Sequence, residues 1–299
     1  MNKKQPLVSV LLPAYNVEAY IAETVESVLE QSFTNFELII INDGSTDKTL
    51  QVVEAFKDPR IILVNQENLG LAKTLNKGLQ MARGEYIARI DGDDICYRNR
   101  LKIQVEYLEN HPEIGLLGTG IELIDEQSQH LGYRVPIIGQ HILPWVIRYQ
   151  GNPIKHPTVM FRRQLALDCG GYDQRIGKYF EDYMLWLKMS QVTAIDNLPK
   201  ILVKYRLTTG SIIGSMKTTE IDTFVGKIMR KGGFTDQDAQ QWQELLARPV
   251  DKTKRQSLEQ SSRFGYYQRF IEIFYPIFGD KVISLLANLK KIKYRGVQI

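Results

Sequence analysis

The sequence has little cysteine, no long apolar run and almost no excess of charge. Cys96 and Cys169 are its two cysteines, so a disulfide framework is excluded and a reducing compartment is expected. No apolar stretch reaches the roughly 18 residues that a membrane-spanning helix needs. Residues 1–6 also lack the apolar run of a secretory signal. The net charge of +4 is too small to indicate a nucleic-acid-binding protein. These absences favour a cytoplasmic globular protein.

Motifs of several enzyme classes are missing as well. No Gly-x-Gly-x-x-Gly follows the first aliphatic segment, and neither Gly-x-x-x-x-Gly-Lys-[Ser/Thr] nor Gly-x-Ser-x-Gly occurs. The four histidines, which are His111, His130, His141 and His156, show no zinc-ligand spacing. A dinucleotide-binding enzyme, a P-loop NTPase, an α/β-hydrolase and a zinc enzyme therefore lose their main support.

What is present is a globular composition, with 43% hydrophobic and 24% charged residues. Short aliphatic segments alternate with amphipathic helical patterns through the first half. The expected strands are 7–12, 36–41, 61–64 and 86–90, followed by shorter ones at 114–119, 158–161 and 201–206. Helices are expected through 21–29, 52–56, 71–82 and 101–108, and from Glu181 onward. This order predicts an α/β fold with a mainly parallel sheet flanked by helices.

After about residue 210 the pattern is wholly helical. We therefore expect a catalytic domain over 1–210 and a helical C-terminal extension over 211–299. Within the domain, the family resemblance described below implies a donor half over about 1–112 and an acceptor half over about 113–210.

Polar residues follow three of the expected parallel strands. They are Pro13-Ala14-Tyr15-Asn16, Asp43-Gly44-Ser45-Thr46-Asp47 and Asp91-Gly92-Asp93-Asp94. Ligands of such sheets bind beyond the carboxyl ends of the strands, so these residues predict the binding edge.

The run Asp91-Gly92-Asp93-Asp94 has two interpretations. Three carboxylates within four residues repel one another, and a divalent cation shared with substrate phosphates would offset that repulsion. Alternatively the run is an acidic turn that caps a helix beginning near Tyr97. The position at a strand end favours the metal.

Two other acidic positions also leave alternatives open. Asp43 can accept a ring N–H of a base such as uracil, or can form an Asx turn with Gly44. Glu181 and Asp182 can include a catalytic base, or can stabilise the dipole of the helix that they begin.

Together, these motifs resemble the family 2 inverting nucleotide-sugar glycosyltransferases, which have the GT-A fold. The resemblance covers residues 7–207. It depends on the three polar runs above and on Asn68-Leu69-Gly70, Gly170-Gly171-Tyr172-Asp173, Glu181-Asp182 and Tyr205-Arg206.

The resemblance implies a role for each matching residue. Donor-binding residues would be Pro13, Ala14, Tyr15, Glu18, Asp43, Asn68, Asp91, Asp93 and Arg206. Asp43 would read the base, Asp93 would face the ribose, and Arg206 would meet the diphosphate. Asp94, with Asp93, would hold Mn²⁺ or Mg²⁺. Asp182 would be the general base, with Glu181 as the alternative. The acceptor side would include His156, Gly171 and Tyr172.

The sequence departs from the family pattern at two places. Many relatives have a histidine shortly after the Tyr-Arg pair, whereas residues 207–211 contain none. The Gln-x-x-Arg-Trp motif of processive synthases is absent too, since Gln260–Phe264 matches it only in part. We therefore expect a non-processive enzyme that adds one sugar per encounter.

Residues 251–299 contain ten basic and four acidic residues, with aromatic and aliphatic residues at helical spacing. Such a tail either packs on the rest of the protein or lies on the inner face of an anionic membrane.

The expected activity is transfer of a sugar from a nucleotide-sugar, with UDP-sugar favoured, to a glycan or lipid-linked acceptor. The expected process is cell-surface polysaccharide synthesis, and no nucleic-acid partner is expected. A nucleotidyltransferase that makes sugar nucleotides, or a GT-A-fold binding subunit without activity, are the alternatives.

Overall fold

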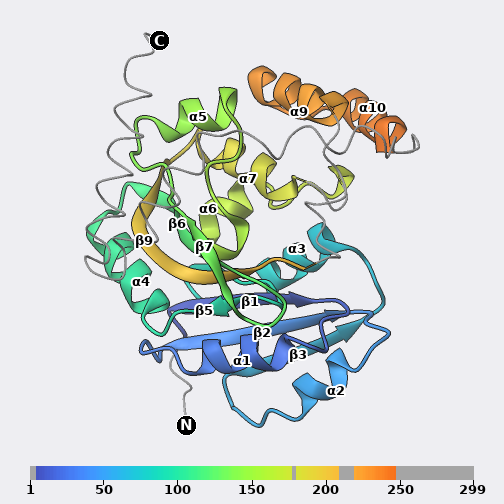
Figure 1. Ribbon diagram of the computed structural model, residues 1–299. Coiled ribbons are helices and arrows are strands. Elements are labelled where there is room, and N and C mark those ends of the chain that lie inside the picture. The colour runs from blue at the N-terminus through green and yellow to red at the C-terminus, as the bar shows by residue number, and fades with distance from the viewer. Residues whose placement is uncertain (1–4, 177–179, 209–218, 247–299) are drawn as a thin grey trace.

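Nine strands form one mixed sheet across the residues that the structure describes (Figure 1). The computed structural model describes residues 5–176, 180–208 and 219–246. The strands are β1 (Val8–Ala14), β2 (Phe36–Asp43), β3 (Ile61–Gln66), β4 (Tyr86–Arg89), β5 (Ile95–Cys96), β6 (Ile114–Ile124), β7 (His130–Arg134), β8 (Met160–Arg162) and β9 (Ala194–Arg206). Their order is β3-β2-β1-β4-β8-β6-β9-β5, and β7 pairs with β6.

Helices cover both faces of the sheet (Figure 1). They are α1 (Ile21–Leu29), α2 (Thr49–Glu54), α3 (Leu71–Met81), α4 (Arg100–Asn110), α5 (Leu143–Tyr149), α6 (Arg163–Asp168), α7 (Glu181–Met189), α9 (Thr219–Lys231) and α10 (Asp236–Leu246). One hydrophobic core includes residues of α1 and α4, and the other includes residues of α3, α5, α6 and α7.

The donor half is parallel, as the sequence predicts. Strand β1 pairs in parallel with β2 on one side and β4 on the other, and β2 pairs in parallel with β3. Successive side chains of a strand point to opposite faces, so Val10 and Leu12 enter one core while Leu11 enters the other. Because both faces are buried, the strand is mainly aliphatic, and its buried Ser9 donates a hydrogen bond to Glu37.

The acceptor half differs from the expected pattern. Strand β8 runs antiparallel between β4 and β6, so the sheet is mixed. Strands β6 and β9, which are parallel to each other, are longer than the expected 114–119 and 201–206. Buried polar residues such as Glu122 and Asn197 interrupt the aliphatic pattern of these strands, and partners from other elements bond to them.

The described part of the C-terminal region packs on the same core as α7. Ile228 and Met229 of α9 and Trp242 of α10 are fully buried in the cluster that contains Trp186. The predicted boundary at residue 210 lies outside the described residues, as does the basic tail 251–299. No helix within the described ranges is long and apolar enough to cross a bilayer.

Candidate active site

The loop after β1 is fastened to the loop after β2. Asn16 N donates to Ser45 Oγ (3.0 Å), while Thr46 N donates to Asn16 Oδ1 (2.8 Å). Glu18 Oε2 accepts from Lys48 N (2.7 Å), so the predicted donor residue Glu18 also braces this pair of loops. Pro13 and the buried Ala14 end β1, and Tyr15 is half exposed directly beyond them. An exposed aromatic ring on a fixed loop is available to a planar ligand.

Asp43 is buried at the end of β2 and holds the loop that follows β3. Its carboxylate accepts hydrogen bonds from Leu69 N (2.9 Å), Gly70 N (3.0 Å) and Gln66 Nε2 (2.8 Å). A β-carbon at Gly44 would lie 2.5 Å from Asn68 N, so the close approach of these loops requires glycine. Asn68, another predicted donor residue, is exposed on this loop.

The three acids after β4 do not cap a helix. Helix α4 begins at Arg100, later than expected, and its N-cap residue Asn99 makes no side-chain capping bond. Instead Asp94, which is 1% exposed, accepts a hydrogen bond at Oδ1 from Arg206 N (2.9 Å) at the end of β9. The capping interpretation of the acidic run therefore has no support.

Burial and mutual repulsion disturb the titration of these acids. Burial, together with the Asp91 charge, raises the pKa of Asp93 to about 6. Burial and the charges of Asp91 and Asp93 raise the pKa of Asp94 well above its usual value. Asp94 Oδ2 is buried without a hydrogen-bond partner. An orphaned carboxylate oxygen beside two like charges is a fitting place for a cation.

Arg89 is the buried cation nearest to this acidic group. It is 2% exposed in β4, and both of its terminal nitrogens pair with the carboxylate of Asp91. Its charge also acts on the titration of Asp94, His156 and Asp182. Sequence reasoning missed Arg89, although an arginine within the aliphatic strand 86–90 signals a buried ion pair.

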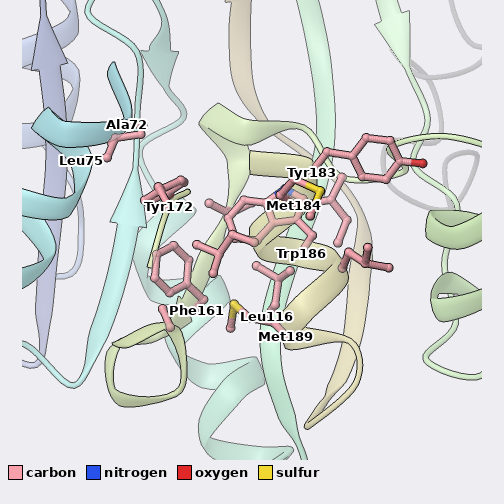
Figure 2. Close-up of a cluster of buried hydrophobic side chains, with 14 of the residues drawn as sticks. Ala72, Leu75, Leu116, Phe161, Tyr172, Tyr183, Met184, Trp186 and Met189 are labelled. Carbon is pink, nitrogen blue, oxygen red and sulfur yellow. The ribbon is translucent and has the colours of Figure 1, made fainter. Parts of the chain in front are cut away.

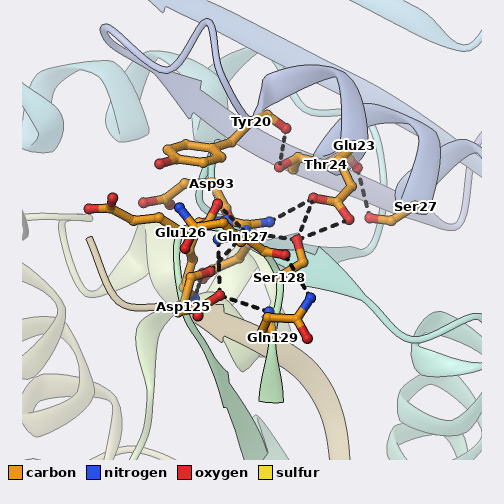
Figure 3. Close-up of polar contacts among 12 residues, drawn as sticks. Tyr20, Glu23, Thr24, Ser27, Asp93, Asp125, Glu126, Gln127, Ser128 and Gln129 are labelled. Carbon is orange, nitrogen blue, oxygen red and sulfur yellow. Dashed lines mark hydrogen bonds and ion pairs between the residues drawn. The ribbon is translucent and has the colours of Figure 1, made fainter. Parts of the chain in front are cut away.

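Arg206 donates to several protein acceptors, and the residues that supply them, Glu23, Asp93, Asp125 and Ser128, are labelled in Figure 3. Its side chain is 1% exposed and donates to Asp93 O (2.8 Å), Asp125 O (3.0 Å), Ser128 Oγ (2.8 Å) and Glu23 Oε2 (2.6 Å). These bonds tie the end of β9 to α1 and to the acidic run. In the structure, Arg206 braces the site, because its guanidinium is bonded to protein acceptors. The sequence resemblance instead implies that this guanidinium meets a diphosphate, which stays a prediction.

On the acceptor side, His156, Tyr172 and Glu181 lie together in the interior. His156 Nε2 shares a hydrogen bond with the Tyr172 hydroxyl (3.1 Å), and His156 Nδ1 lies 3.5 Å from Glu181 Oε1. Tyr172 also packs near Trp186 (Figure 2). Burial, assisted by the Arg89 charge, lowers the pKa of His156 to about 3, so the ring is neutral. Burial raises the pKa of Glu181 to about 7.

The Gly171–Tyr172 turn is fixed against α3. Asn76 accepts from Tyr172 N at Oδ1 (2.9 Å) and donates from Nδ2 to Tyr172 O (2.8 Å). Gly171 has φ +66°, and a β-carbon there would lie 2.5 Å from Asn76 Oδ1. Only glycine fits this turn, which sets the position of the Tyr172 ring.

Asp182 is more accessible than Glu181 and has a dedicated partner. Its Oδ2 accepts from Asn152 Nδ2 (2.9 Å), and its Oδ1 accepts from Tyr183 N (2.6 Å). The Asn152 amide is itself oriented, because its Oδ1 accepts from Ile154 N (3.1 Å). Burial, and next the Glu181 charge, raises the pKa of Asp182. Sequence reasoning missed Asn152, and no local signal links two residues 30 positions apart.

The charge of Arg89 therefore acts on two groups of predicted residues, the acids after β4 and the group of His156, Glu181 and Asp182. The loops of Tyr15 and Asp43 continue the same edge along β1 and β2. Among the described residues, no three His, Cys, Asp or Glu side chains form a metal cage by themselves. A metal here would need ligands from a bound substrate.

Comparison with known proteins decides the family. The sequence model described as "Glycosyl transferase family 2" matches residues 9–171. The chain belongs to glycosyltransferase family 2. An uncharacterized glycosyltransferase of Haemophilus influenzae is 36% identical over 76% of this chain and 73% of its own length. The amylovoran biosynthesis glycosyltransferase AmsE of Erwinia amylovora is 34% identical over 66% of this chain and 75% of its own.

Solved structures agree on the fold of this family 2 glycosyltransferase. S. aureus TarS (residues 1–349), in complex with UDP-GlcNAc, matches with a TM-score of 0.62 and 21% identity, over 83% of this chain and 69% of TarS. The mannosyltransferase PcManGT of Pyrobaculum calidifontis, in complex with GDP-Man and Mn²⁺, matches with a TM-score of 0.55 and 17% identity, over 97% of this chain and 88% of its own. The expected GT-A-type fold is thereby confirmed, and the enzyme is a glycosyltransferase, as predicted.

The raised pKa of Glu181 predicts a pH-dependent stability. Its pKa is about 7 in the folded protein and 4.5 without burial, so between these values the folded state holds more protons than the unfolded state. Stability then falls as pH rises through this window. In thermal denaturation without divalent cations, we expect the wild type to lose Tm relative to Glu181→Gln between pH 4.5 and 7. A constant Tm difference would contradict the buried, protonated Glu181.

Proposed function

We propose that this glycosyltransferase is metal-dependent and inverting, and that its donor is a nucleotide-sugar, with UDP-sugar favoured. It transfers one sugar to a hydroxyl of a glycan or lipid-linked acceptor in cell-surface polysaccharide synthesis. The nucleotide complexes of TarS and PcManGT support a nucleotide-sugar donor. The name of AmsE supports a biosynthetic pathway for polysaccharide.

The observation that carries this proposal is the buried Asp94 carboxylate. Its Oδ2 has no partner, and the nearby Asp91 and Asp93 charges oppose its ionisation. Without a cation, this repulsion opposes folding, and the bond that Oδ1 accepts from Arg206 N does not account for the buried, unpartnered Oδ2. Asp94 and Asp93 fit Mn²⁺ or Mg²⁺ if donor phosphates complete the coordination. When bound, the metal stabilises negative charge on the leaving diphosphate.

Asp182 is the general base in this proposal. An inverting transfer needs one base on the acceptor side, because the departing diphosphate requires no proton. Asp182 is partly accessible and oriented by Asn152, whereas Glu181 is buried against His156. Glu181, His156 and Tyr172 then shape the acceptor side, with Gly171 fixing the turn. Asp182 takes the proton from the acceptor hydroxyl as its oxygen attacks the anomeric carbon opposite the leaving group.

The donor nucleotide lies along the loops after β1, β2 and β3. Tyr15 offers an exposed ring above the fixed Pro13–Ala14 strand end. Asp43 retains accepting capacity on Oδ2 for a base N–H beyond its bonds to the loop. Glu18 and Asn68 border this loop pair. Asp91, which pairs with Arg89, also belongs to the donor site in this proposal.

Asp94→Asn is expected to abolish the stabilisation of the protein by UDP with Mn²⁺. A ligand at 100 times its Kd stabilises by about 2.7 kcal/mol, which a thermal-shift panel of UDP, GDP and ADP with and without Mn²⁺ detects. Without metal at pH 7.5, the variant is expected to be at least as stable as the wild type, because a repelled buried charge is removed. The exposed Asp168→Asn is the matched control. A full Mn²⁺-dependent shift in Asp94→Asn would refute the metal assignment.

Asp182→Asn is expected to lower kcat for sugar transfer by roughly 10²–10⁴-fold, the usual contribution of a general base. The Kd for UDP with Mn²⁺, measured by calorimetry, should stay within about twofold, because the side chain is on the acceptor side. Glu181→Gln is the informative comparison. If Glu181→Gln lost transfer while Asp182→Asn retained it, the two roles would be exchanged.

Asn152→Ala is expected to shift the pH profile of kcat. The Asn152 hydrogen bond favours the ionised Asp182, so its loss raises the pKa of the base. The acidic limb of the profile should therefore move to higher pH by about one unit. A hydrogen bond to a charged group contributes roughly 1.5–3 kcal/mol, which corresponds to a pKa change of at least this size. Asn110→Ala, on the surface of α4, is the control. An unshifted acidic limb in Asn152→Ala would exclude this orienting role.

A further inference from the structure

The helical hairpin formed by α9 and α10 contacts the segment that leads into α7 (Figure 1). Trp242 of α10 is fully buried, and its Nε1 donates to Ile176 O (2.8 Å). The same indole ring packs edge-on against the ring of Phe180, at 4.6 Å between centroids. Ile176 and Phe180 lie on either side of residues 177–179, which are not described. One side chain thus fastens the chain before and after this stretch.

Phe180 is the residue directly before Glu181 and Asp182, and its backbone is unusual. It is the N-cap of α7 and has a left-handed conformation, with φ +43° and ψ +24°. A bulky residue seldom adopts this conformation, and it persists only where surrounding contacts enforce it. Its carbonyl accepts the first hydrogen bond of α7, from Met184 N (3.1 Å). The contact with Trp242 therefore acts at the point that sets the direction of Asp182.

Polar contacts reinforce the same attachment. Arg175 Nη2 donates to Phe234 O (3.0 Å), and Gln243 Nε2 donates to Arg175 O (3.1 Å). Arg175 also pairs with Asp236, but that carboxylate is 94% exposed. Exposed ion pairs contribute little, so the buried Trp242 contacts dominate. Phe224 of α9 stacks on the other side of the Trp242 ring, at 5.6 Å.

We propose that Trp242 is a positioning residue for the catalytic base: through Ile176 and Phe180 it fixes the start of α7 and hence Asp182. This inference rests on the proposed function, in which Asp182 takes the proton of the acceptor hydroxyl. If Trp242 positions Asp182, the hairpin of α9 and α10 contributes to catalysis. Small displacements of a reacting group cost rate steeply, so a distant residue can control kcat.

Hydrogen exchange tests the anchoring independently of activity. The Met184 amide, which bonds to Phe180 O, is expected to exchange roughly tenfold faster in Trp242→Ala, because local opening becomes easier. The matched control is Ile228→Ala, which removes a fully buried side chain of the same core from α9. It should lower Tm while leaving the Met184 amide protected. Equal acceleration in both variants, or none in Trp242→Ala, would overturn the proposal.

Kinetics test the consequence for the reaction. At a temperature where circular dichroism shows all variants folded, Trp242→Ala should lose roughly 10–100-fold in kcat for transfer. Its KM for the nucleotide-sugar should stay within about twofold of the wild type. Trp242→Phe, which retains the ring contacts and loses the bond to Ile176, should lie between the wild type and Trp242→Ala. It also provides the comparison if the alanine variant does not fold.

Failure of the proposed function and failure of the positioning role of Trp242 give different results. If the wild type turned over no nucleotide-sugar, the proposed function would fail, while the exchange of the Met184 amide would still decide whether Trp242 anchors α7. If the wild type were active but Trp242→Ala and Trp242→Phe kept its kcat, or if Ile228→Ala lost as much, the positioning role would be refuted.

Discussion

The site depends on burying several carboxylates beside the guanidinium of Arg89, with Arg206 as a second buried cation near Asp93. Arg89 is 2% exposed, and its charge acts on acids from both halves of the chain, including Asp94 and Glu181. Burial nevertheless raises the pKa values of Asp93, Asp94, Glu181 and Asp182, because desolvation disfavours their charged forms. The remaining negative charge is an electrostatic cost of the fold, which binding of a cation would relieve under the proposed metal dependence.

The sheet makes this arrangement possible by joining two kinds of strand pairing. Parallel pairing of β1, β2 and β4 brings the loops of the donor side to one edge. The antiparallel insertion of β8 between β4 and β6 then places the acceptor half beside that edge. Backbone hydrogen bonds therefore join the two parts of the sheet, and bracing residues such as Arg206 and Asn76 fix the loops upon them.

The C-terminal helices also brace the site, from outside the sheet. The left-handed Phe180 is the start of α7, and a helix cannot hold such a residue by its own hydrogen bonds. Trp242 supplies an external contact from a residue 62 positions later in the chain. Catalytic groups that must stay in reach of a substrate generally need rigid support from residues that do not themselves contact the substrate.

The sequence by itself determined the parallel donor half, because aliphatic strands buried on both faces and the polar runs after them are local patterns. It also marked Asp43, Asp94 and Asp182 as candidates, since clustered carboxylates at strand and helix ends are visible in the linear order. Only the tertiary structure decided that Arg206 braces the site, that Arg89 links its two sides, and that Asn152 and Trp242 support the acceptor-side acids. Those relations join residues far apart in the chain, and no local spacing encodes a hydrogen bond or a ring contact between distant elements.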